Sequence, residues 1–109
     1  MKYLITENRL NDIIFKYLNA KLDGIEQKEG SILNIVFVFP NEDYGMLGYN
    51  RTGDLVIRYK FAKEISDFFG IEYDDSKMII GKWVQDRFDK KVTNIYATTD
   101  LNILKVARY

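Results

Sequence analysis

The chain has 109 residues, no cysteine, no histidine, and 16 basic side chains balanced by 16 acidic ones. This size suits a single domain spanning residues 1–109, and a composition of 47% hydrophobic and 29% charged residues indicates an ordered globular fold. The formal net charge of zero argues against a dedicated duplex-DNA binder, and the lack of cysteine excludes a disulfide-stabilised secreted scaffold.

The first predicted element is a helix that begins after Thr6. Thr6 is a suitable N-cap, and Ile5 and Leu10 have the spacing of a hydrophobic staple across it. Gly24 is expected to end the helix. An apolar stripe with helical spacing lies between these signals: Leu10, Ile13, Ile14, Tyr17 and Leu18.

The run from Ile32 to Phe39 predicts an interior strand. It is rich in β-branched and aromatic residues, is bounded by Gly30 and Pro40, and is apolar on both faces. It holds the longest uninterrupted apolar stretch, residues 35–39, far short of the roughly 20 residues that a membrane span needs. The first seven residues turn polar too early for the core of a signal peptide, so we expect a cytoplasmic protein without a membrane partner.

Two further strands are predicted at residues 44–49 and 55–60. They flank Asn50-Arg51-Thr52-Gly53, a sequence typical of a hairpin loop. In the second strand one set of side chains should face the core and the alternate set should face water. The two sets are Leu55, Ile57 and Tyr59, and Val56, Arg58 and Lys60.

Two helices are predicted next. Residues 61–69 carry apolar side chains at helical spacing and are followed by Gly70 as a stop signal. Asp74-Asp75-Ser76 supplies a cap and negative charge at the start of the third helix. Gly81 within the buried stripe of that helix predicts a close backbone contact, and Trp83 on the same stripe is expected in the core.

Two last strands are predicted at residues 92–97 and 101–108, which gives the order α-β-β-β-α-α-β-β. Sequential strands with short turns favour an antiparallel sheet of about five strands. The predicted fold is therefore α+β, a two-layer sandwich with an antiparallel sheet and helices on one face.

The residue types bound the chemistry. Without histidine and cysteine, the commonest general base, thiol nucleophiles and the usual zinc ligands are missing. We therefore expect no enzyme, no cofactor and no metal site. The clustered carboxylates Glu42-Asp43 and Asp74-Asp75 are the remaining candidates for a hard cation, but a turn and a helix N-terminus are the favoured explanations for them.

The predicted outward face of the strands offers two binding hypotheses. The first is protein contact or self-association through that face and its edge, with Tyr44, Tyr49, Val56 and the tail from Leu104 to Tyr109. The second is single-stranded nucleic-acid binding by basic groups interleaved with an aromatic ring: Arg51, Arg58, Lys60 and Tyr49. A solvated face that only keeps the sheet soluble is the structural alternative.

Three short segments resemble small uncharacterised proteins of tailed bacteriophages from marine and other environmental viral genomes. They are Met1-Lys2-Tyr3-Leu4-Ile5-Thr6-Glu7, Ile14-Phe15-Lys16-Tyr17-Leu18 and Ile80-Gly81-Lys82-Trp83-Val84. The resemblance implies a phage-encoded protein of the host cytoplasm and carries no functional residue. The leading hypothesis is a non-enzymatic protein-binding module, a phage accessory protein, with a nucleic-acid binder and a minor virion component as alternatives.

Overall fold

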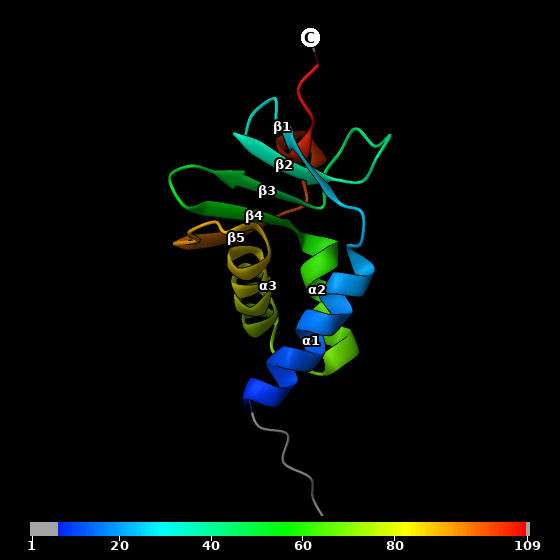
Figure 1. The fold of residues 1–109 in the computed structure, drawn as a ribbon, viewed down its shortest axis with the longest axis vertical. Coiled ribbons are helices and arrows are strands. Elements are labelled where there is room, and N and C mark those ends of the chain that lie inside the picture. Colours follow the sequence, from blue (N-terminus) through cyan, green and yellow to red (C-terminus); the bar gives the residue numbers. More distant parts are fainter. Residues whose placement is uncertain (1–6, 109) are drawn as a thin grey trace, which may run out of the picture.

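Residues 7–108 are described by the computed structural model, which contains three helices, five strands and one short 3₁₀ helix (Figure 1). The predicted N-cap Thr6 and its staple partner Ile5 lie outside the described residues. The elements are α1 (Glu7–Lys21), β1 (Glu26–Glu29), β2 (Ile35–Val38), β3 (Leu47–Asn50), β4 (Asp54–Arg58), α2 (Tyr59–Phe69), α3 (Tyr73–Phe88), β5 (Asn94–Thr98) and η1 (Leu101–Leu104).

The five strands form one mixed sheet in the order β1-β2-β3-β4-β5. The first four pair antiparallel, but β5 runs parallel to β4, with Val56 opposite Tyr96. The α+β class and the five strands are confirmed, whereas antiparallel pairing throughout is not. The reason is topological, because α2 and α3 carry the chain from the end of β4 back to the level of its start, and such a crossover produces parallel strands.

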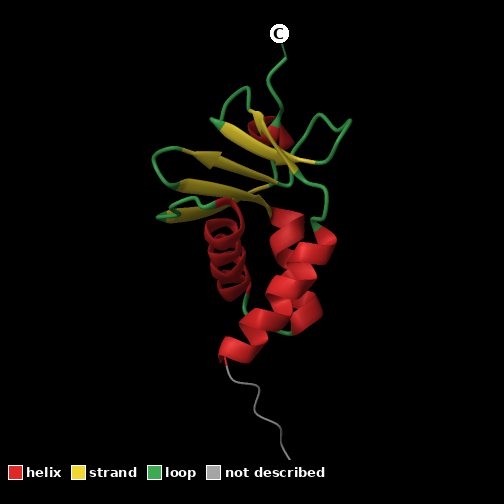
Figure 2. Ribbon diagram, in the orientation of Figure 1, coloured by secondary structure: helices red, strands yellow, loops and turns green. Residues whose placement is uncertain are grey.

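All three helices lie on one side of the sheet, as predicted (Figure 2). Side chains from the helix-facing side of β2, β3 and β4 form one buried cluster with all three helices, which contribute Ile14, Ile65 and Trp83, among others. Trp83 is fully buried as expected, and its indole nitrogen donates a hydrogen bond to Oδ1 of Asn19 at 2.8 Å. Gly81 lies against Ile95 of β5, because a Cβ added at Gly81 would approach Cδ1 of Ile95 to 2.5 Å.

Local signals set several boundaries correctly. The loop between β3 and β4 is residues 51–53, closed by a hydrogen bond from the amide of Gly53 to the carbonyl of Asn50 at 2.9 Å. Gly70 ends α2 in the left-handed conformation, with φ of 63°. However, α3 begins at Tyr73 without a side-chain cap, and buried Ser76 instead donates to backbone carbonyls of Ala62 or Tyr73.

Two strand predictions are corrected. Tyr59 and Lys60 belong to α2, since the chain turns into the helix directly after Arg58. Residues 26–29, for which no element was predicted, form β1 through pairing with β2, which their local sequence does not favour.

The C-terminal segment, residues 101–107, forms η1 and then an extended stretch in place of the predicted strand. It meets the sheet at two single bridges, Gly30–Val106 and Tyr44–Lys105. The amide of Gly45 donates to the carbonyl of Leu104 at 2.8 Å, and the amide of Ala107 donates to the carbonyl of Glu29 at 2.8 Å. The segment therefore crosses the sheet between β1 and the loop before β3. Its own residue Leu104 is fully buried.

We expect Leu104→Ala to lower the free energy of unfolding by about 2–5 kcal/mol, the usual cost of removing a fully buried leucine side chain. Leu101→Ala is the matched control, since Leu101 begins the same 3₁₀ helix and is 40% exposed. Urea denaturation of both variants measures the difference. Equal losses would contradict the buried position of Leu104.

Candidate functional site

The face of the sheet opposite the helices, here called the outer face, is covered over one half and open over the other. The strand register aligns Val36, Gly48, Val56 and Tyr96 in one row across β2, β3, β4 and β5. Val36 is fully buried, Val56 is half-buried and Tyr96 is 53% exposed. Exposure therefore rises steadily along the row toward β5.

The covered half is closed by the chain's own side chains. A Cβ at Gly48 would collide with the side chain of Leu33 and would lie 2.8 Å from Cδ2 of Leu104. Both leucines therefore rest directly on the backbone of β3, where no side chain holds them off. The C-terminal segment begins beyond the end of β5 and covers β3 and β2. On β4 and β5 the outward residues Val56, Arg58 and Thr98 are half-buried and Tyr96 is exposed; we call the face that these four residues form the open face.

A groove of about 450 Å³ lies at the end of the open face, with a mostly apolar lining. It sits where the parallel strands β4 and β5 end, a common location for binding sites in sheets with parallel strands. The residues that line it are Arg58, Tyr59, Lys60, Thr98, Thr99 and Leu101. Of the candidate residues from the sequence, only Arg58 and Lys60 meet here.

Arg58 forms a fixed wall of this groove. Its Nε donates to the carbonyl of Gly45 at 2.7 Å, and its Nη2 donates to the carbonyl of Tyr44 at 3.1 Å. The guanidinium thus ties the end of β4 to the segment that precedes β3. Tyr44 is half-buried beside it, in a bridge with Lys105. Lys60 is exposed in the first turn of α2.

The expected exposure of Tyr49 and of Leu104 is wrong. Tyr49 pairs with Leu55, so both point toward the helices, and the hydroxyl of Tyr49 donates to the carbonyl of Lys91 at 2.6 Å. Leu104 points inward onto Gly48. Neither side chain reaches the open face. Tyr96 lies on that face but is not one of the candidate residues from the sequence, although its alternation with Ile95 and Ala97 is visible in the sequence.

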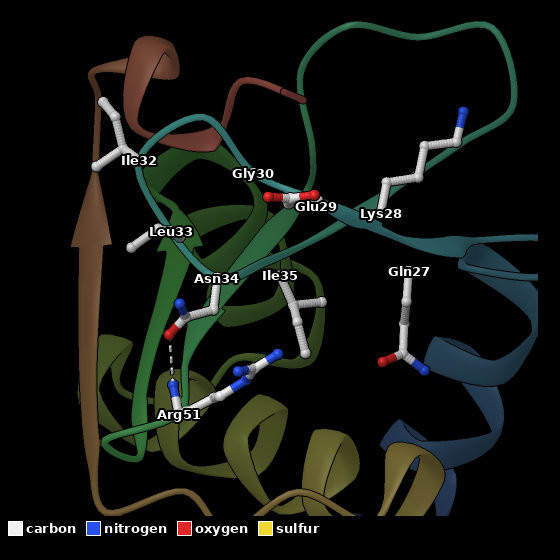
Figure 3. Close-up of a pocket in the computed structure, with 9 residues that line it drawn as sticks. All are labelled: Gln27, Lys28, Glu29, Gly30, Ile32, Leu33, Asn34, Ile35 and Arg51. Atoms are coloured by element: carbon white, nitrogen blue, oxygen red, sulfur yellow. Dashed lines mark hydrogen bonds between the residues drawn. The ribbon is translucent and has the colours of Figure 1, made fainter. Parts of the chain in front are cut away.

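Arg51 lies at the other end of β4, in a second hollow of about 500 Å³ (Figure 3). Its amide donates to Oδ1 of Asn34 at 2.9 Å, and the amide of Asn34 donates to Oδ1 of Asn50 at 3.1 Å. These bonds clamp the β3–β4 loop to the turn before β2. The basic and aromatic residues proposed to stack nucleic-acid bases are therefore divided between two ends of the sheet and its buried face.

Two of the four candidate carboxylates form ion pairs with basic neighbours. Asp43 pairs with Arg108, and Oδ1 of Asp74 lies 3.2 Å from Nζ of Lys77. Within residues 7–108, no three acidic side chains are grouped so that they could hold a metal ion.

Burial raises the pKa of Tyr73, whose ring packs 5.5 Å from that of Tyr59 beside the groove.

Comparison of the chain with protein-family models, with curated proteins and with solved structures found no match. In the part of the chain that the structure describes, no helix combines the length and apolar character required to cross a membrane.

We expect Arg58→Met to lower the free energy of unfolding by about 1–3 kcal/mol, because two backbone carbonyls lose a charged donor. Methionine keeps much of the apolar stem, so packing changes little. Lys60→Met, at an exposed position two residues further on, should stay within about 0.5 kcal/mol of the parent chain. Thermal or urea unfolding compares the two, and a neutral Arg58→Met would show that its hydrogen bonds add nothing.

Proposed function

We propose that this chain is a non-enzymatic protein-binding module whose contact surface is the open face together with the free edge of β5. The observation that carries the proposal is Tyr96, which is 53% exposed at the centre of an edge strand. Tyrosine combines a large apolar ring with a polar tip, and it is enriched at protein interfaces for that reason. Half-buried Val56 beside it extends the apolar surface.

The surroundings of Tyr96 favour a protein over nucleic acid. The groove next to the open face is mostly apolar, and the cation of Arg58 is already bonded to two backbone carbonyls. Nucleic-acid binding depends on basic groups that are available to neutralise phosphates. Lys60 is the one lysine that lines this groove, and Arg51 lies in the other hollow.

The groove also supports a binding role rather than catalysis. The ionisable side chains that line it are Arg58, Tyr59 and Lys60. No carboxylate is among the lining residues, and the sequence contains no histidine that could act as a general base.

The biological setting forms part of the same proposal. The resemblance of three short segments to proteins of tailed bacteriophages supports a phage accessory protein that acts in the host cytoplasm. A module of this kind would bind its partner without chemical change. A minor virion component would use the same surface in a repeated assembly. The identity of the partner therefore distinguishes an accessory protein from a virion component.

Photo-crosslinking in cells tests the proposal. We expect p-benzoylphenylalanine at position 96 to form covalent adducts with protein when irradiated in cells that express the full chain. The matched control is the same group at Lys28, which belongs to the same cross-strand row but lies on the opposite edge strand, β1.

Protein adducts at position 96 and their absence at position 28 support the proposal. Equal adducts at both positions, or none at position 96, would contradict it. Adducts that disappear after nuclease treatment would instead favour the nucleic-acid alternative.

A further inference from the structure

The two edges of the sheet differ in charge. β1 has the sequence Glu26-Gln27-Lys28-Glu29, and charged side chains on an edge strand discourage pairing with another chain. β5 has the sequence Asn94-Ile95-Tyr96-Ala97-Thr98 and carries no charge at all. One edge is therefore protected against strand addition, and the other is not.

Exposed apolar groups flank the β5 edge on both faces of the sheet. Tyr96 lies on the outer face and is 53% exposed. On the helix side, Met78 of α3 is 54% exposed and lines shallow hollows together with Thr93 and Ile95. A strand added to β5 would shield apolar surface on both faces as well as satisfying backbone groups at the edge.

The charges at the two ends of β5 are opposite. Asp89, Lys90 and Lys91 precede the strand and together carry a net positive charge, and the acidic Asp100 follows it. If β5 pairs antiparallel with an identical strand, the start of each strand meets the end of the other. Each lysine pair then approaches the Asp100 of the second copy, and attraction between them favours this direction.

We propose that β5 pairs antiparallel with β5 of a second copy of this chain, about a two-fold axis at Tyr96. This inference rests on the proposed function and names its partner. The register places Tyr96 opposite its own copy, Asn94 opposite Thr98, and Ile95 opposite Ala97. The two-fold axis is perpendicular to the sheet, so the open faces of both copies join and the helices of both lie on the other side. Such an interface is isologous, the commonest arrangement in dimers.

Disulfide trapping tests this register in a chain that has no cysteine of its own. We expect an equimolar mixture of Asn94→Cys and Thr98→Cys chains to form a covalent dimer under mild oxidation. Opposite residues of antiparallel strands have Cα atoms about 4.5–5.5 Å apart, within the range of a disulfide. Tyr96 is unchanged in both variants.

Each cysteine variant alone is the matched control. In the proposed register two copies of residue 94 are four residues apart along the strands, about 14 Å, which is too far for a disulfide. Equal cross-linking of Asn94→Cys alone and of the mixture would overturn the register. A mixture that stays monomeric would overturn self-pairing.

A charge at the axis provides the second measurement. We expect Tyr96→Lys to weaken dimerisation at least about tenfold in light scattering after size-exclusion chromatography, because like charges directly opposite each other destabilise a strand pair. Ile32→Lys is the control, since Ile32 is also exposed but lies in the β1–β2 connection. Circular dichroism establishes that both variants remain folded. A dimer that Tyr96→Lys does not weaken would overturn the proposal.

These outcomes separate the inference from the proposed function. A parent chain that stays monomeric at high concentration, while photo-crosslinking at position 96 captures a different protein, removes self-pairing and leaves the binding module intact. A monomer that forms no adduct at position 96 removes both.

Discussion

The contact of Leu33 and Leu104 with the backbone at Gly48 determines which part of the outer face of the sheet the chain itself covers. A side chain at position 48 would occupy the space of both leucines, so the close approach depends on glycine there. Once the leucines are seated, the C-terminal segment bonds to residues on either side of β2, and Val36 and Val38 lose contact with water. The coverage ends at Gly48, and the next strands remain open.

The crossover through α2 and α3 determines which strand forms the edge of this open part and which side chains lie on it. It places β5 beyond β4 and parallel to it, so a strand from late in the chain becomes the edge of the sheet. Gly81 lets α3 approach Ile95 closely, which anchors β5 from the helix side. Because Ile95 points to the helices, Tyr96 must point outward, since successive side chains of a strand face opposite sides.

Local signals in the sequence were sufficient for the three helices and for β2 to β5, but not for β1, for the C-terminal segment or for the orientation of every side chain. The alternation of Leu55 and Ile57 with Val56 and Arg58 was predicted correctly, because β4 is apolar on one face only. The inward orientation of Tyr49 was missed, although apolar Leu47 lies on the same face two residues earlier; Gly48 between them has no side chain to mark the other face. Likewise, the pairing of β1 and the direction of β5 depend on contacts between distant segments, which local patterns do not report.

Gly45 is hydrogen-bonded to both the covered and the open half of the outer face. Its amide donates to the carbonyl of Leu104, and its carbonyl accepts from Nε of Arg58. The segment that covers one half and the arginine that bounds the groove of the other half are thus hydrogen-bonded to the N–H and C=O groups of one residue. A surface whose boundary is fixed in this way loses little conformational freedom when a partner binds, so more of the contact free energy appears as affinity. Tyr96 is exposed beside this boundary, so under the proposed function a partner strand would be arranged around it.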